Sequence, residues 1–170
     1  MPAIEQQRLG ESRERLILHQ RSEFRQAIEL MAQQASRSID ILTYDLDKPV
    51  YDQAGFLEAV KQLALRTPGL SIRILLQQSE KVQKEGHRLI DLARRVTSRI
   101  EIRRPHADYI DHPENFIVVD RTGYVRRSQP DRYEGEANFC HPLESKLLSE
   151  FFTEVWDKSE VESTLRRLYL

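Results

Sequence analysis

The side chains best suited to chemistry gather in one segment near the middle of the chain. That segment holds His106, Asp108, Asp111, His112 and Glu114. An imidazole can attack an electrophile or carry a proton near neutral pH. Imidazole and carboxylate groups are also metal ligands, but these residues follow no established metal-binding spacing. We therefore predict neither a metal nor another cofactor, and we treat the segment as a candidate ligand-binding loop or as plain surface.

Arginines form two clusters that could bind phosphate groups. The first lies between residues 87 and 104, and the second surrounds a predicted hairpin; the members are Arg88, Arg94, Arg95, Arg99, Arg103 and Arg104, then Arg121, Arg126, Arg127 and Arg132. Planar guanidinium groups match phosphate oxygens, so the clusters are compatible with a nucleic-acid surface. However, the 26 basic residues are balanced by 27 acidic ones, and no aromatic residues for base stacking are interleaved. We therefore favour solvent-facing arginines paired with acids, and keep the nucleic-acid surface as the alternative.

Three further places have competing interpretations. Asp45 and Asp47 follow a predicted strand, where open α/β sheets bind ligands, but they also suit a turn. Gly86 lies inside a predicted helix, where glycine is unfavourable, and this indicates close helix packing or a close ligand. Cys140 is the single cysteine and stands beside His141. We predict no catalysis there, because nucleophilic Cys–His pairs form in space rather than in sequence.

The elements that position these residues alternate between strands and helices. Apolar, β-branched runs predict strands, and apolar residues at helical spacing predict helices. Strands are expected at 38–44, 70–76, 99–103, 115–119, 124–127 and 135–139, and helices at 22–35, 53–66, 80–96 and 142–156. This order predicts an α/β fold with a mixed, parallel-rich sheet, flanked by helices on both faces, whose later strands are antiparallel.

Length and composition fit one domain with short extensions. The chain has 170 residues and a mass of 20.0 kDa. We predict an N-terminal extension or edge strand at 1–20, the α/β domain at 21–160 and a C-terminal helical tail at 161–170. The single cysteine excludes an intramolecular disulfide framework. No apolar run approaches 18 residues, and residues 1–15 lack the apolar core of a signal peptide, so we expect a cytoplasmic protein without membrane contact.

The segment at 112–120, HPENFIVVD, resembles the signature of the phospholipase D (PLD) superfamily, His-x-Lys followed by four residues and Asp. The segments SRSIDILTY at 36–44 and LSIRILL at 70–76 resemble the opening of such a domain, and LESKLLSEFFTEVWDKS at 143–159 resembles its closing helix. The resemblance implies a PLD-like fold over residues 36–159. It extends to a bacterial branch whose members sometimes accompany acetyltransferase domains; this chain has no acetyl-CoA loop, so we predict no acetyltransferase activity.

The two catalytic residues of that signature, its histidine and its lysine, are replaced in this chain. Pro113 stands where the resemblance places the nucleophilic histidine, and Asn115 stands where it places the phosphate-binding lysine. His112 lies one position too early, and Asp120 and Ser128 match the signature. In the family, the histidine forms a phosphohistidine intermediate and the lysine neutralises phosphoryl oxygens. Because this chain lacks both groups, the resemblance favours a binding domain over an enzyme.

We therefore predict a non-catalytic PLD-like domain that acts as a binding or interaction module for an anionic ligand or a protein partner. The candidate ligand-binding residues are His87, Arg88, His112, Asn115, Asp120, Arg127 and Ser128. One alternative is a divergent phosphodiesterase or nuclease that uses His112 and Asp120. Another is nucleic-acid binding through the arginine clusters.

The length has a further implication. Active PLD superfamily enzymes combine two signature motifs, from two repeats or from two chains. A chain of 170 residues with one motif corresponds to one half of that arrangement. The resemblance therefore implies a homodimer, formed through a sheet edge or through the cleft face.

Overall fold

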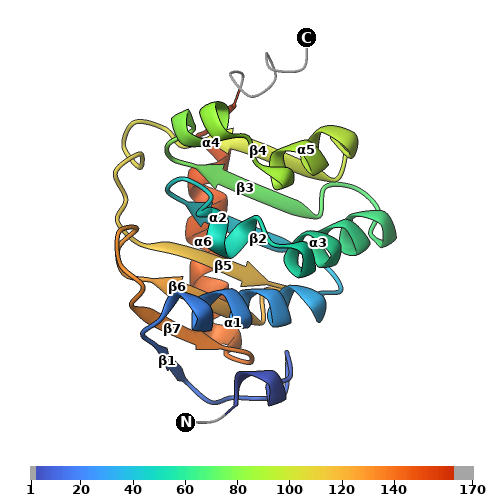
Figure 1. Cartoon of the computed structure of the whole chain (residues 1–170), viewed down its shortest axis with the longest axis vertical. Coiled ribbons are helices and arrows are strands. Elements are labelled where there is room, and N and C mark those ends of the chain that lie inside the picture. Colours follow the sequence, from blue (N-terminus) through green and yellow to red (C-terminus); the bar gives the residue numbers. More distant parts are fainter. Residues whose placement is uncertain (1–2, 163–170) are drawn as a thin grey trace.

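Eight strands form one mixed sheet in the computed structural model, which describes residues 3–162 (Figure 1). The strands are β1 (Leu16–Leu18), β2 (Ile39–Thr43), β3 (Ile72–Leu76), β4 (Ile100–Arg104), β5 (Asn115–Val119), β6 (Gly123–Arg127), β7 (Gly135–Asn138) and β8 (Glu160–Val161). Their order across the sheet is β1-β7-β6-β5-β2-β3-β4-β8. Parallel pairing joins β2, β3 and β4, and the other neighbours are antiparallel. The predicted α/β fold with a mixed sheet is confirmed, but the sheet is not parallel-rich, because only two of its seven strand pairings are parallel.

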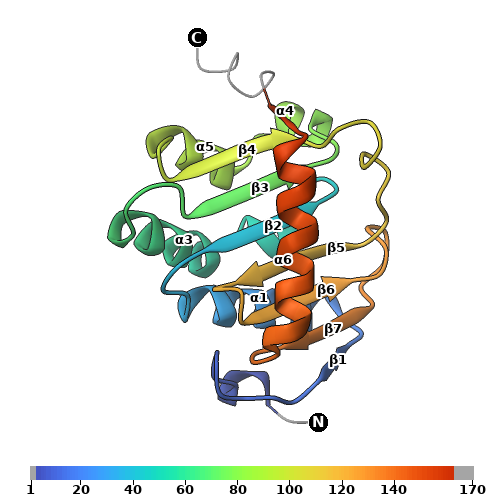
Figure 2. The same ribbon diagram turned by 180° about the vertical axis from the view of Figure 1, so that it is seen from behind.

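Helices cover both faces of this sheet. On the face seen in Figure 1 lie α1 (Arg21–Gln33), α2 (Lys48–Tyr51), α3 (Ala54–Arg66), α4 (Glu80–Glu85) and α5 (Arg88–Arg95). On the opposite face α6 (Pro142–Asp157) runs across the strands (Figure 2). A short 3-10 helix, η1 (Ile4–Gln6), precedes β1. Helices therefore flank the sheet on both sides, as the alternation of elements predicts.

The sheet divides the apolar core into two clusters. Successive side chains of a strand point to opposite faces, so Ile41 joins the cluster with α1, α3 and α5, whereas Leu42 joins the cluster with α6. Every residue of β2 and of β5 is buried. Strands that are covered on both faces consist almost wholly of apolar residues, which explains the continuous apolar run at the centre of the PLD-like signature.

One predicted helix is wrong as a single element. The segment predicted as a helix over 80–96 contains α4 and α5, separated by Gly86 and His87. Gly86 has φ 74° and ψ 165°, a conformation that other residues rarely adopt. A Cβ atom there would meet no atom within 4 Å, so close packing does not explain the glycine. The backbone turn between the two helices explains it. The four-residue α2 was also not predicted.

The two ends of the described chain reach opposite edges of the sheet. β1 lies at one edge and pairs with β7, and the two-residue β8 lies at the other edge and pairs with β4. Of the predicted helical tail at 161–170, the structure describes only Val161, which belongs to β8, and Glu162. Residues 163–170 lie outside the described residues. None of the helices in the described part of the chain has the length and apolar character needed to span a membrane.

Candidate functional site

Asn115 begins β5 at the position where the PLD signature has its lysine. Its side chain is buried, with 7% of the residue exposed. The Oδ1 atom accepts the backbone N–H of Tyr44 at 2.9 Å, and the Nδ2 atom donates to Oε1 of Gln77 at 3.0 Å. Tyr44 follows β2 and Gln77 follows β3, so the amide of Asn115 joins three strand ends. Both polar groups of this side chain are thus used inside the protein.

Arg127 ends β6, and its guanidinium group is fully engaged. It pairs with Asp47 at 3.3 Å, donates to the backbone carbonyls of Arg132 and Pro130 at 2.6 and 2.5 Å, and lies 4.3 Å from the centre of the Tyr133 ring. The hydroxyl of Tyr133 donates to the same carboxylate at 2.5 Å. Burial and this hydrogen bond raise the pKa of Tyr133 to about 12. Asp47 therefore acts as a partner within the protein, not as a free ligand group.

Little space remains between Asn115 and Arg127, which are paired across β5 and β6. The cavity that they line with Thr43 and Tyr51 has a volume of about 20 Å³. This is roughly the space that one water molecule needs. Burial raises the pKa of the Tyr51 phenol, so this side chain stays neutral. The region that corresponds to the catalytic centre of the PLD signature is therefore filled by the protein's own side chains.

His112 lies on the other side of the sheet. Its ring centre is 4.8 Å from that of Phe151 on α6, whereas Tyr133, which stacks on Arg127, contacts Phe24 on α1. Burial lowers the pKa of His112. The neighbouring Pro113 is exposed. The structure thus places His112 against α6 and does not bring it together with Arg127.

Asp120 lies at the far end of β5 and holds a turn. Its carboxylate accepts the backbone N–H groups of Ser36 at 2.9 Å, Arg37 at 2.7 Å and Ser38 at 3.0 Å. Five strand residues separate it from the segment of His112, a span of roughly 16 Å at the usual rise per residue. The phosphodiesterase alternative needs His112 and Asp120 in one pocket, and the structure keeps them at opposite ends of the strand. Ser128 is exposed beyond the end of β6.

His87 and Arg88 belong to the start of α5. His87 is buried, and its Nδ1 atom accepts the backbone N–H of Leu89 at 3.1 Å, which caps the helix. The Nε2 atom therefore carries the proton and donates to the carbonyl of Leu46 at 2.9 Å. Burial lowers the pKa of His87, so a neutral capping role fits this residue. Arg88 is exposed and pairs with Asp52 at 2.6 Å.

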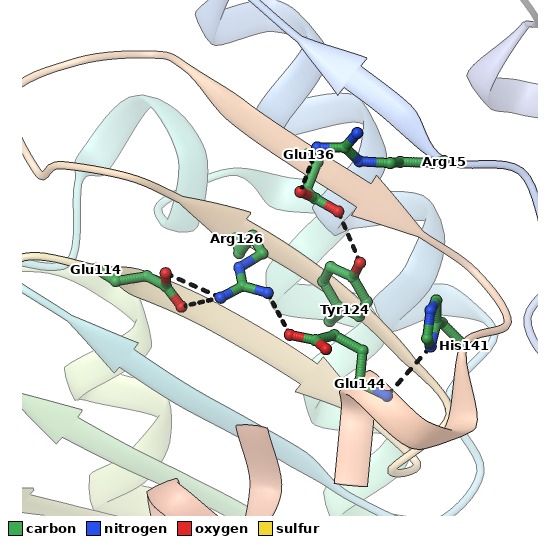
Figure 3. A network of polar contacts seen from close by, with 7 residues as sticks. All are labelled: Arg15, Glu114, Tyr124, Arg126, Glu136, His141 and Glu144. Atoms are coloured by element: carbon green, nitrogen blue, oxygen red, sulfur yellow. Dashed lines mark hydrogen bonds and ion pairs between the residues drawn. The ribbon is translucent and has the colours of Figure 1, made fainter. Parts of the chain in front are cut away.

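The second arginine cluster is split between the two faces of the sheet. Arg126 precedes Arg127 in β6 and points the opposite way, toward α6 (Figure 3). Its guanidinium group pairs with both oxygens of Glu114 at 2.8 and 3.0 Å and with Glu144 at 2.5 Å. Glu144 also donates its backbone N–H to Nδ1 of His141, the N-cap of α6. Arg126 thus ties the loop before β5 to the start of α6.

The first arginine cluster is also divided. Arg103 pairs with Glu101 at 2.6 Å and lies 4.3 Å from the centre of the Trp156 ring on the α6 face. Arg99 donates to the backbone carbonyl of Thr67 at the end of α3, whereas Arg88 lies on the side of α2. The two predicted clusters therefore do not form one continuous surface. Five of the ten arginines in these clusters have an acidic partner in the described part of the chain, namely Arg88, Arg94, Arg103, Arg126 and Arg127.

A different set of basic residues does come together. Arg21 and Arg25 from α1, Lys48 from α2 and Arg88 from α5 line a groove with a volume of about 560 Å³. The groove also contains Asp52, and its remaining lining residues are Ser22, Pro49 and Gln53. Of the predicted candidates, only Arg88 belongs to it. The sequence contained one signal of this groove, because Arg21 and Arg25 are four residues apart and share a helix face.

Within residues 3–162, no cluster of His, Cys, Asp and Glu has the arrangement of a metal site.

Solved structures define the class of this fold. Nuc from Salmonella typhimurium, a phospholipase D family member, has a TM-score of 0.64 and 14% identity, over 87% of this chain and 98% of Nuc. NucT from Helicobacter pylori has a TM-score of 0.61 and 11% identity, over 87% and 97%. TrmBL2, an archaeal chromatin protein with a novel mode of DNA binding, has a TM-score of 0.63 and 15% identity, over 89% of this chain and 55% of TrmBL2. The chain thus has a PLD-like α/β fold and spans about half the length of TrmBL2.

The family of the chain follows from its sequence. A family model described as a domain of unknown function, DUF7931, matches residues 20–168, and the chain belongs to this family. No curated protein matches it.

Proposed function

We propose that this chain is a non-catalytic PLD-like domain that binds an anionic ligand. The observation that carries the first half of this proposal is the environment of Asn115. The residue stands where the signature has its phosphate-binding lysine. Its amide is hydrogen-bonded to the backbone N–H of Tyr44 and to the side chain of Gln77. A neutral side chain used in this way supplies no positive charge to a phosphoryl group, and such stabilisation is a large part of phosphoryl-transfer catalysis.

The nucleophile is absent as well. Pro113 has no side chain that can attack phosphorus. The neighbouring His112 packs on Phe151 across the sheet from Arg127. A phosphodiester bound near Asn115 therefore meets neither a nucleophile nor a free cation, and we expect no turnover.

The second half of the proposal, anion binding, is supported by the groove between α1, α2 and α5. Its four basic side chains face one carboxylate, Asp52, which is already paired with Arg88. The fold itself is compatible with such a role, since TrmBL2 has the same fold and binds DNA. Guanidinium groups that remain available to solvent are well suited to phosphate oxygens.

Turnover is tested with bis(p-nitrophenyl) phosphate and with labelled single-stranded DNA, with a phosphodiesterase of established activity on both substrates as the positive control. We expect the chain and its His112→Ala variant to give only background hydrolysis. Hydrolysis by the parent that the His112→Ala variant loses would contradict the absence of catalysis and would establish the phosphodiesterase alternative.

Anion binding is tested by thermal unfolding at constant ionic strength, with sodium chloride exchanged for phosphate or pyrophosphate. A ligand that binds the folded state raises the Tm with its concentration. We expect pyrophosphate to raise the Tm above that in chloride. An identical Tm in all these salts would contradict anion binding while leaving the absence of turnover intact.

A further inference from the structure

The groove between α1, α2 and α5 draws its cations from three separate parts of the chain. Arg21 and Arg25 come from the first turns of α1, Lys48 is the first residue of α2, and Arg88 is the first residue of α5. α2 follows β2 and α5 follows β3 and α4, so the groove opens toward the carboxyl ends of two parallel strands. Ligand sites of open α/β sheets lie at such ends. A volume of about 560 Å³ is within the range of small-molecule sites.

Positive charges outnumber negative charges in this groove, and some of them have no ion-pair partner among the described residues. Four basic side chains against one carboxylate leave a net formal charge of +3. Asp52 is held by Arg88 at 2.6 Å, and Lys48 donates to the backbone carbonyl of Glu85 at 3.3 Å, which leaves its charge uncompensated. The exposed guanidinium groups of Arg21 and Arg25 form no ion pair with any residue between 3 and 162. Their donors are free to meet an anion.

The surfaces beside the groove do not continue this positive charge. Next to Arg88, Lys61 and Arg95 are balanced by Glu58 and Asp91. On the other flank, two lysines are outnumbered by three acids; these residues are Lys81, Lys84, Asp45, Glu80 and Glu85. A nucleic-acid strand carries a charge on every nucleotide and would run onto neutral or acidic surface within a few nucleotides. The groove lining also contains no aromatic side chain on which a base could stack.

These observations favour a compact ligand with a high charge. A single phosphate group carries about −1.5 to −2 at pH 7, which leaves part of a +3 groove uncompensated. Two linked phosphate groups can match that charge and offer more oxygens than a single phosphate to the four basic side chains that line the groove. The two arginines on α1 are one helical turn apart, which suits neighbouring phosphates.

We propose that this groove binds a small ligand that carries a diphosphate group, held by Arg21, Arg25, Lys48 and Arg88. The proposal rests on the anion-binding role proposed above and names the site and the ligand chemistry for it. The site is separate from the filled region around Asn115, so a ligand can bind there without any catalytic residue.

Isothermal titration of the full chain with inorganic pyrophosphate tests this assignment. We expect measurable binding by the parent, and a loss of about tenfold or more in affinity in the double variant Arg21→Gln and Arg25→Gln. Glutamine is a good helix former, and both positions are exposed, so α1 should remain folded. The matched control is Arg37→Gln, which removes an exposed arginine beyond the other end of α1 and should leave the affinity unchanged.

Two further titrations define the ligand class. Orthophosphate should bind about tenfold more weakly than pyrophosphate, and a 12-nucleotide single strand should bind no more tightly than pyrophosphate. Equal affinities for the two phosphates would overturn the diphosphate assignment. Tighter binding of the DNA strand would overturn the compact ligand in favour of a nucleic acid.

The variants also separate this proposal from the anion-binding role itself. If pyrophosphate binds the parent and the double variant equally, the groove assignment fails, and anion binding stands at another place. If pyrophosphate does not bind the parent at all, both proposals fail together.

Discussion

At the residue level, Asn115 changes what the start of β5 can do. Its amide satisfies the backbone N–H of Tyr44 and the side chain of Gln77, and Gln77 in turn donates to the carbonyl of His112 at 2.8 Å. A lysine in this buried place would bring an ammonium group among apolar neighbours, which is costly without an anion. The neutral amide therefore gives the strand ends stability where the PLD signature has a charged binding group.

Replacement of this amide tests the structural role. In Asn115→Ala, the N–H of Tyr44 and Oε1 of Gln77 lose their partner inside the protein, and we expect a loss of about 2–3 kcal/mol in unfolding free energy. Urea unfolding followed by circular dichroism measures it. The matched control, Ser128→Ala, changes an exposed side chain and should stay within about 0.5 kcal/mol of the parent. A loss in Asn115→Ala as small as in the control would contradict the structural role.

His87 links stability to pH. Its folded pKa lies below the ordinary value of 6.5 because the ring is buried, so protonation favours the unfolded chain. Its contribution is fully present above the unfolded pKa and is lost as the pH falls from about 6.5 toward the lower folded pKa. In His87→Asn, the helix cap can persist, but the bond to Leu46 is lost. We expect lower stability at pH 7.5 and a smaller fall between pH 7.5 and 5.5.

Urea unfolding of the parent and of His87→Asn at these two pH values measures the difference. His106→Asn, an exposed histidine, is the control and should fall like the parent. Burial also lowers the pKa of His112, so part of the fall should remain in each protein. A His87→Asn variant that loses as much stability on acidification as the parent would show that His87 does not produce this dependence.

At the level of elements, β6 and β7 approach each other so closely that one position excludes a side chain. A Cβ atom at Gly135 would lie 2.0 Å from the carbonyl oxygen of Arg126 on the paired strand. Backbone atoms cannot move aside as the end of a flexible side chain can. The end of β7 therefore needs glycine for its pairing with β6.

Gly135→Ala tests this close approach. We expect a loss of about 2–3 kcal/mol in unfolding free energy, because the two strands must separate to fit the methyl group. Thermal and urea unfolding give the value. The neighbouring exposed residue supplies the control, Glu134→Ala, which should change stability by less than about 0.5 kcal/mol. Equal stability of the two variants would mean that β7 shifts freely.

Local sequence patterns predicted the strands and the long helices well. Apolar runs such as 115–119 must be buried on both faces, and the spacing of Leu148, Phe152 and Val155 fits the apolar face of α6. The break at Gly86 was missed, because the apolar spacing over 80–96 continues through it while the backbone conformation does not. The basic groove, in contrast, depends on residues that are far apart in the sequence. Arg21, Lys48 and Arg88 meet in one groove only through the order of the strands, which local patterns do not encode.

The state of assembly belongs to the scale of the whole molecule. The homodimer that the PLD resemblance implies remains a proposal, and β1 offers one place for it. This strand lies at the edge of the sheet, and its central residue, Ile17, is 39% exposed. An apolar edge strand can pair with another chain through its free backbone groups.

Light scattering after size exclusion tests the dimer. We expect twice the chain mass of 20.0 kDa, and a single-chain mass for Ile17→Lys, since a charge on the edge opposes pairing. The control Leu143→Lys changes another exposed apolar residue, on α6, and should leave the mass unchanged. A parent of 20.0 kDa would rule out the dimer, and a dimeric Ile17→Lys would rule out this edge as its interface.

The position of α6 in the chain affects how the protein is made. This helix covers the back of the sheet, yet it follows every central strand in the sequence (Figure 2). During translation, Leu42, Leu75, Phe116 and Val118 are synthesised before the helix that shields them from water. A nascent chain that has not yet emerged from the ribosome as far as Trp156 therefore exposes a broad apolar surface to chaperones and to other chains. Ribosome pausing ahead of α6 should favour aggregation, whereas a pause after it should not.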